Sequence, residues 1–226
     1  MMKREGFTLA EVLITLGIIG VVAAMTIPTL ISNTNGAQFK TGFKKALSTL
    51  NQMSLMNLAI EDYDLSSLVA GTLEEQKKGS SAPQKTLAYI LGNRTNAYYI
   101  ENYAFPAAGI ELKGYYEASD GTVTEVSATA KSDTWVVYQF QDNTAFGYPI
   151  AAAACDEKGK ANCMGFIDAN GGTTANPNSV QTCSTGSEGN DCVVTSNDVK
   201  DIFPVFFYGQ TIEPASDAVR QVLFGK

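Results

Sequence analysis

The chain has 226 residues, of which 45% are hydrophobic and 17% charged, and its formal net charge is −7. An acidic balance disfavours a broad nucleic-acid-binding surface, because phosphate backbones repel negative charge. The sequence contains no histidine, which excludes Ser-His and Cys-His catalysis and removes the commonest zinc ligand. We therefore expect neither enzyme activity nor a cofactor or metal centre.

The N-terminal segment is strongly apolar. Residues 1–6 are polar and include Lys3 and Arg4, whereas residues 7–31 carry one formal charge, on Glu11. A helix of that length spans about 37 Å, enough to cross a hydrocarbon core of roughly 30 Å. The two basic residues are expected to stay on the cytoplasmic side, which places the bulk of the chain outside. The alternative is a secretory signal cleaved near residues 23–25, although the apolar run continues past that point.

Glu11 is the unusual residue of this segment. A carboxylate in an apolar run is costly and marks a function, unless it lies at headgroup level and is simply solvated. The local string Gly6-Phe7-Thr8-Leu9-Ala10-Glu11, followed by apolar residues, resembles the type III signal of type IV prepilins and type II secretion pseudopilins. The resemblance extends from Lys3 to about Ile31.

This resemblance implies a specific maturation. A prepilin peptidase would cleave between Gly6 and Phe7 and N-methylate Phe7, so that the mature chain keeps its apolar helix. Glu11 of an incoming subunit would then pair with the N-terminal amine of a neighbour. The implied function is a structural pilin or pseudopilin, major or minor, of a type IV pilus or a type II secretion filament. The alternative is a membrane-anchored exported binding domain that does not polymerise.

The resemblance also implies partners and a location. The partners are identical or related pilin subunits, the prepilin peptidase, the inner-membrane assembly machinery and, before assembly, membrane lipid. The chain would cross the inner membrane once, with its head outside the cytoplasm, and then enter a periplasmic or cell-surface filament. The sequence does not distinguish a pilus from a secretion system.

Small residues and a proline interrupt the apolar segment. Gly20 and Ala24 form a small-xxx-small pattern suited to close helix packing, although glycine is also common in membrane helices. Pro28 removes a helix hydrogen bond and is expected to kink the helix. The resemblance implies local melting of the helix between Gly20 and Pro28.

The polar stretch 32–36 predicts a flexible step, and residues 37–60 predict an amphipathic helix. Its apolar positions recur in steps of three or four: Phe39, Phe43, Ala46, Leu50, Met53, Met56 and Ile60. The expected organisation is therefore a leader at 1–6, a membrane-spanning or filament-core helix at 7–31, an amphipathic helix at 32–60 and a globular head at 61–226.

The head is expected to be α+β, with a small antiparallel sheet of three to five strands packed on the long helix. Residues 62–131 are hard to interpret, with possible short helices at 73–78 and 84–91. Their aromatic-rich stretch, which includes Tyr98, Tyr103 and Tyr115, favours core packing over a binding face. Strands are expected at 134–141, 145–152, 165–168 and 201–208.

The sequence contains four cysteines, all between residues 155 and 192. Cys155, Cys163, Cys183 and Cys192 are expected to form two disulfides in an exported chain. The simplest pairing is Cys155–Cys163 with Cys183–Cys192, but three connectivities are open, and so is plain apolar filling.

Asp168 and Asn170, followed by Gly171, have the spacing that begins a calcium loop. Position 179 is serine where such a loop needs a bidentate acid, so a tight turn is favoured. The Gly-rich acidic stretch 184–191 is expected to be a solvated surface loop.

Overall fold

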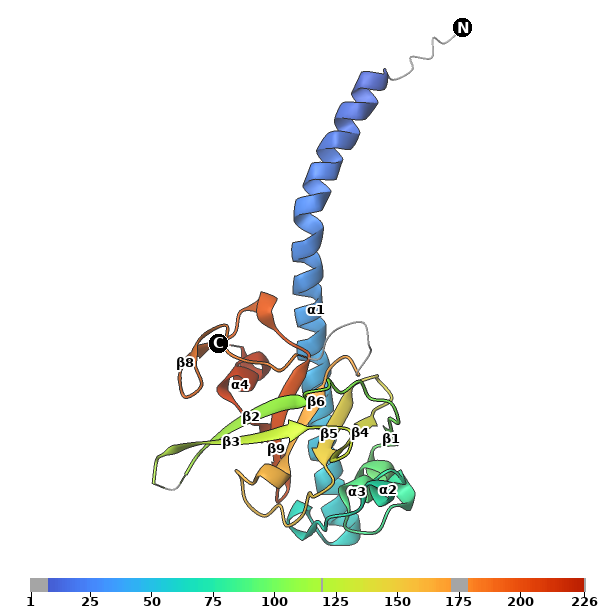
Figure 1. Ribbon diagram of the computed structural model, residues 1–226, viewed down its shortest axis with the longest axis vertical. Helices are drawn as coiled ribbons and strands as arrows, with labels where there is room; N and C mark the ends of the chain where they lie inside the picture. The colour runs from blue at the N-terminus through green and yellow to red at the C-terminus, as the bar shows by residue number, and fades with distance from the viewer. Residues whose placement is uncertain (1–7, 119, 172–178, 226) are drawn as a thin grey trace.

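The computed structural model describes residues 8–118, 120–171 and 179–225. A single long helix, α1 (Leu9–Glu61), rises from a compact head that holds all the strands (Figure 1). The fold is α+β, as expected. The other helices are α2 (Leu73–Gln76), α3 (Leu87–Arg94) and α4 (Asp217–Phe224), with single 3-10 turns at Leu65–Ser67, Gly79–Ser81, Ala161–Cys163 and Ser196–Asp198.

Helix α1 is continuous from the apolar segment into the head. The flexible step expected at residues 32–36 is wrong, because the backbone there is helical. Threonine side chains within and after this stretch bond back into the helix: the hydroxyl of Thr34 donates to the carbonyl of Leu30 at 2.8 Å, and that of Thr41 to the carbonyl of Ala37 at 2.9 Å. Helix formation on both sides of this polar stretch outweighs its weak intrinsic propensity, since extending a helix is easier than starting one.

Among the described residues, ten strands form three antiparallel sheets. The main sheet has six strands in the order β1-β4-β5-β6-β9-β10, where three to five were expected, and β2–β3 and β7–β8 are separate two-stranded ribbons. The bounds are β1 Tyr98–Tyr99, β2 Ile110–Glu117, β3 Val123–Ala130, β4 Trp135–Gln139, β5 Ala145–Pro149, β6 Met164–Asp168, β7 Thr185–Ser187, β8 Asn190–Val193, β9 Ile202–Tyr208 and β10 Thr211–Pro214.

One face of the main sheet packs on the second half of α1. Phe43, Leu50 and Met53 are buried there, and Phe43 stacks on Phe203 of β9 with ring centroids 4.4 Å apart. Two positions of the predicted stripe, Met56 and Ile60, are exposed instead. The buried face passes instead to Ser54 and Asn57, which lie one turn after Leu50 and Met53 in the helical period of about 3.6 residues.

The other face of the main sheet is covered by the β2–β3 hairpin. Alternate residues of β4 point to opposite sides, so that Val136 and Tyr138 face α1 while Trp135 and Val137 face the hairpin. Burial on both faces explains why the central strands β5, β6 and β9 are almost continuously buried. The aromatic stretch belongs partly to this second core, with Tyr103 resting edge-on against Phe105.

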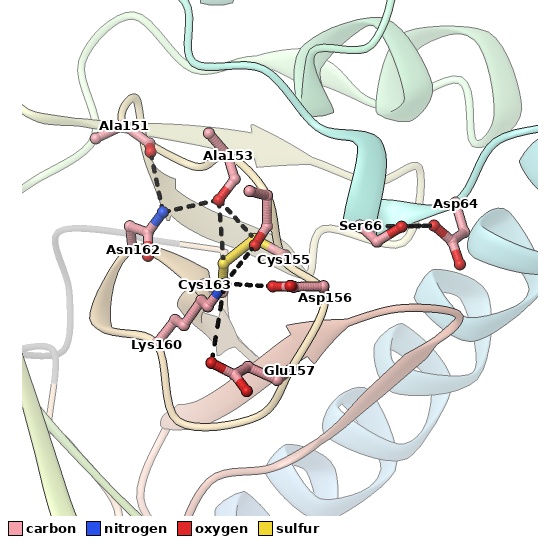
Figure 2. A network of polar contacts seen from close by, with 11 residues as sticks. Asp64, Ser66, Ala151, Ala153, Cys155, Asp156, Glu157, Lys160, Asn162 and Cys163 are labelled. Atoms are coloured by element: carbon pink, nitrogen blue, oxygen red, sulfur yellow. Dashed lines mark hydrogen bonds and ion pairs between the residues drawn. A yellow bond between two sulfur atoms is a disulfide. The ribbon is translucent and has the colours of Figure 1, made fainter.

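Both disulfides have the pairing expected as simplest. Cys155 bonds to Cys163 in the loop between β5 and β6, and Cys183 bonds to Cys192 around the β7–β8 ribbon. Beside the first bridge, Asn162 donates to the carbonyl of Ala153 at 2.9 Å, and Lys160 pairs with Asp156 (Figure 2). The first bridge and these polar contacts together fix the loop at its base.

Asp168 ends β6 in the tight turn favoured by the sequence. Its Oδ1 accepts from the backbone N–H groups of Asn170 and Gly171 at 2.9 and 3.0 Å, and its Oδ2 accepts from the Tyr103 hydroxyl at 2.7 Å. The side-chain amide of Asn170 donates to Asp201 at 2.9 Å. Burial raises the pKa of Asp168 to about 6, and the neighbouring charge of Asp201 adds to this shift.

The edge of the main sheet at β10 is covered by one side chain of α1. The amide of Asn51 donates to the carbonyl of Ile212 at 2.8 Å and accepts from the Ile212 N–H at 3.0 Å. It thereby satisfies both outward backbone groups of that residue, as another strand would. Asn51 thus joins the helix to the sheet edge.

Replacing Asn51 by alanine should therefore destabilise the head. Removing both hydrogen bonds leaves partly buried backbone groups unpaired, at a cost of about 1–3 kcal/mol. Urea unfolding of the full chain in detergent micelles, followed by the fluorescence of the buried Trp135, measures this cost. Gln52→Ala, an exposed neighbour on the same helix, is the control and should change stability by less than about 0.5 kcal/mol. Equal effects of the two variants would contradict the role of Asn51.

Asp168 should make the head less stable as pH rises. Its folded pKa lies above the unfolded value near 4, so its contribution is full below pH of about 4 and is lost through about pH 6. Asp168→Asn keeps an oxygen for the two N–H groups and has no charge to bury. Its stability relative to wild type should therefore increase between pH 4 and 7, by at most about 3 kcal/mol.

The same urea titration across pH tests this prediction. Asp156→Asn is the matched control, because Lys160 lowers the pKa of Asp156. That variant should lose relative stability as pH rises. A pH-independent difference between wild type and Asp168→Asn would show that the Asp168 carboxylate does not resist ionisation in the fold.

Candidate functional site

The site indicated by the sequence is the N-terminal half of α1. Thr8 caps the helix, and its hydroxyl oxygen accepts from the backbone N–H of Glu11 at 3.3 Å. Oε2 of Glu11 in turn accepts from the backbone N–H and from the hydroxyl of Thr8, each at 2.8 Å. This is a capping box, in which the acid and the cap satisfy each other.

The capping box supplies what an isolated carboxylate needs in an apolar setting. Glu11 lies in the first turn, where the N-terminal end of the helix dipole favours a negative charge. Within the described part of the chain, Glu11 forms no ion pair. Its charge therefore remains available to a cation from another molecule.

The helix around Glu11 is long and apolar enough to cross a membrane. The span runs over Leu9–Pro28, 20 residues of which none is buried, and corresponds to about 30 Å of helix. Large apolar side chains are exposed on every side of it: Leu9, Val12, Leu13, Ile14, Leu16, Ile18, Ile19, Val21, Val22, Met25 and Ile27. A helix that is apolar all round requires an apolar environment.

The polar side chains inside this span are satisfied within the helix. The hydroxyl of Thr15 donates to the carbonyls of Glu11 and Val12 at 2.9 and 3.0 Å, and that of Thr26 donates to the carbonyl of Val22 at 3.0 Å. Such back-bonding hides the hydroxyls from hydrocarbon. The segment can therefore lie in lipid or in a protein bundle without an unsatisfied threonine.

The small residues of the span offer open surface. A Cβ added at Gly17 or Gly20 would meet no atom within 4 Å, so both positions allow a second helix to approach closely. Pro28 lies inside α1, and the helix is assigned without a break across Gly20–Pro28. Figure 1 shows a gentle curve of α1 above the head, and the kink expected at Gly20 and Pro28 stays a prediction.

The remaining residues singled out by the sequence are Gly6, Phe7, Asp168 and Asn170. Gly6 and Phe7, the expected cleavage and methylation positions, lie outside the described residues. Asp168 and Asn170 belong to the buried turn of the head, where both oxygens of Asp168 already accept hydrogen bonds. Thr8 was not singled out as a partner of Glu11, although the Thr-x-x-Glu spacing is a recognised sign of a capping box.

Comparison with known proteins bears on this same segment. The family model described as the prokaryotic N-terminal methylation motif matches residues 1–27. Neither the comparison with curated proteins nor that with solved structures gives a match. The matched range contains Gly6, Phe7 and Glu11 and nearly all of the exposed apolar span. The chain therefore carries at its N-terminus the methylation motif that is the signal of type IV pilins and pseudopilins.

Proposed function

We propose that this chain is the precursor of a structural subunit, a pilin or pseudopilin, of an extracytoplasmic filament. In this proposal residues 1–6 are a leader removed after Gly6, and residues 7–31 anchor the chain and later line the filament core. Residues 32–60 form the helical spine, and residues 61–226 form the head. This role requires no catalytic group and no cofactor.

The observation that carries the proposal is the unpartnered apolar surface of α1. None of the span Leu9–Pro28 is buried against the head, and exposing so many apolar side chains to water is strongly unfavourable. Lipid can cover the helix first, and the same helices of neighbouring subunits can cover it after assembly. A head that leaves this half of α1 free is suited to both states.

Glu11 gives the assembly a direction. Cleavage after Gly6 would create a positively charged amine on Phe7, four residues before Glu11 in the same chain. In an apolar core this amine and the carboxylate of a neighbouring subunit would neutralise each other. Because the acid of one copy meets the amine of the next, the contact is heterologous and extends into a helix of subunits. Before assembly, the capping box with Thr8 would hold the acid in place.

The location and the partners follow from this arrangement. The chain would cross the inner membrane once with its head outside, be processed by a prepilin peptidase at the cytoplasmic face, and be taken up by an inner-membrane assembly machinery. The filament is a type IV pilus or a type II secretion filament. The net charge of −7 argues against a direct role of this subunit as a nucleic-acid receptor.

The mature N-terminus shows where the precursor is cleaved and whether it is methylated. Mass spectrometry of the protein isolated from its native membrane should find a chain that begins at an N-methylated Phe7. Substitution of Gly6 by alanine should reduce cleavage, because a side chain hinders access of the peptidase to the backbone. A mature protein that begins downstream of Ala24 would show that the apolar helix is discarded, which rules out the filament core.

Assembly should depend on the charge of Glu11. Glu11→Gln retains the capping box, since glutamine serves equally well at that position, but it cannot pair with an amine. Loss of one partner of a buried pair costs about 3–5 kcal/mol, so filament recovery should fall roughly a hundredfold or more. Membrane insertion and processing should remain normal. Sheared-filament yield, normalised to membrane-bound protein, gives the measurement.

Two further variants complete this experiment. Thr15→Ala changes a polar residue one turn away without changing the charge and should assemble normally. Glu11→Ala should behave as Glu11→Gln does, which separates the ion pair from helix capping. Normal filament yield from Glu11→Gln would remove the charge of Glu11 from the mechanism and favour an anchored head that does not polymerise.

A further inference from the structure

The hairpin β2–β3 carries an open backbone edge. In its ladder the N–H of Tyr115 donates to Ala215 rather than to Glu125 opposite, and the N–H of Ala118 donates to Thr122. Tyr115 and Glu125 are therefore a non-hydrogen-bonded pair, whereas Ala118 and Thr122 are hydrogen-bonded to each other. Because the two kinds of pair alternate along an antiparallel ladder, every odd-numbered residue of β3 belongs to a non-hydrogen-bonded pair. In β3 the backbone groups of four residues consequently point away from β2: Val123, Glu125, Ser127 and Thr129.

Within the described part of the chain, the backbone N–H and C=O groups of these four residues have no hydrogen-bond partner on that side. The free edge extends from Val123 to Thr129, about 20 Å at roughly 3.3 Å per residue. By contrast, the edge of β10 is covered by the amide of Asn51. The edge of β10 thus has a side chain that satisfies its backbone, whereas the edge of β3 has none among the described residues.

β3 also lacks the features that normally protect an edge. Natural edges are interrupted by proline, by lysine or by a β-bulge. β3 contains no proline and no lysine, and it pairs with β2 over eight consecutive residues without a shift of register. Its one charged side chain, Glu125, is paired with Lys113 at 3.2 Å and with the Tyr115 hydroxyl at 2.9 Å.

The hairpin is placed where another molecule can reach it. Figure 1 shows β2 and β3 extending sideways from the head, with their connecting turn well away from α1. Val123, Glu125, Ser127 and Thr129 are all exposed. A strand could therefore approach without displacing the helix or the main sheet.

The β3 edge is complementary to itself. If two copies pair antiparallel with Val126 opposite Val126, all four outward residues of each copy meet outward residues of the other. Val123 then lies opposite Thr129, and Glu125 opposite Ser127. No like charges face each other, and a valine pair occupies the centre, an arrangement that favours pairing between strands.

Charges beyond the strand ends match in the same register. Lys131 of one copy comes opposite Gly121 of the other, beside Asp120 in the turn and close to Glu117. Lys131 and Glu117 are exposed, and neither forms an ion pair among the described residues. Two-fold symmetry would give this favourable contact at both ends of the paired strands.

We propose that β3 is a docking edge for β3 of a second copy of this chain, which joins two hairpins into one four-stranded antiparallel sheet centred on Val126. The contact is isologous and closes after two copies. It therefore differs from the heterologous contact proposed for Glu11 and does not depend on it. Its effect is to link chains laterally, head to head, rather than to extend a filament.

Cysteine crosslinking of the full chain in detergent micelles tests the register. In this pairing Val126 faces its own copy in a non-hydrogen-bonded pair, with Cα atoms about 4.5 Å apart, a distance that a disulfide can bridge. Val126→Cys should therefore form a disulfide-linked dimer under mild oxidation. The native cysteines are already paired, so the new thiol is the reactive one.

Ala128→Cys is the matched control. Residue 128 has the same orientation and the same partial burial as residue 126, but it faces residue 124 of the partner. Two copies of residue 128 are then about 13 Å apart along the strands and should not crosslink. An equal mixture of Thr124→Cys and Ala128→Cys chains, in contrast, should form a heterodimer. Equal linking of the Val126→Cys and Ala128→Cys chains would overturn the proposed register.

A charge substitution tests the energetics without a crosslink. Ser127→Glu places a second acid opposite Glu125 at two symmetric positions, which should weaken dimerisation roughly tenfold. Within its own hairpin, residue 127 lies opposite Lys113, so an acid there should not destabilise the fold. Ser127→Lys should instead keep or strengthen the dimer. Light scattering of the micellar protein gives the association constant.

The outcomes separate this proposal from the one for Glu11. Dimerisation in the Glu11→Gln background supports an independent β3 contact, whereas a dimer lost with Glu11 and insensitive to Ser127→Glu would overturn it. A Val126→Cys chain that links in cells to a different protein, and not to itself, would also overturn it and would show that β3 receives another partner.

Discussion

The first half of α1 exposes apolar side chains in every direction, and the described part of the head covers none of the span Leu9–Pro28. This unsatisfied surface is the constraint on which the rest of the molecule depends. It requires an apolar environment, such as lipid or the helices of other molecules, because exposing so much apolar surface to water is unfavourable. Because none of this span is buried against the described part of the head, the head has to be stable without it.

The head meets this requirement by burying its sheet on both faces. The second half of α1 covers one face and the β2–β3 hairpin covers the other. Both odd- and even-numbered residues of β4 and β9 are therefore buried. Two disulfides hold the loops between the strands, and Asn51 covers the β10 edge. Stability is thus concentrated in the part of the chain that does not enter the membrane.

Charge is handled differently in the two parts of the chain. Glu11 in the apolar helix is satisfied locally by Thr8, and it forms no ion pair with the described residues, so its charge is available to a cation of another molecule. Asp168 in the head is buried and fixed by three hydrogen bonds, and its raised pKa is a consequence of that burial. The first acid is suited to changing partners, and the second to holding a turn.

The two proposed contacts would also act along different directions. The contact through Glu11 connects successive subunits through their helices, whereas the β3 edge lies on a hairpin that extends sideways from the head (Figure 1). Separate surfaces allow the two contacts to form independently. A subunit with both could join a filament through its helix and a neighbouring chain through its head.

The sequence by itself determined the apolar helix, its single acid and the methylation motif, because these features are local and depend on residue order alone. It also predicted the strands seen as β4, β5, β6 and β9, since their patterns lie in short windows. For the cysteines it left three connectivities open, of which the simplest is the one observed. In contrast, the pattern of residues 62–131 did not predict the β2–β3 hairpin, because its small residues and glycines show only a weak alternation of apolar and polar positions.

Only the tertiary structure decided how these pieces meet. It turned Met56 and Ile60 to the surface, brought Asp168 to the Tyr103 hydroxyl, and brought Asn170 to Asp201. It also placed Asn51 against the β10 edge and left the β3 edge open. Each of these results depends on contacts between residues distant in the chain, and the free energy of such contacts is absent from any local pattern of residues.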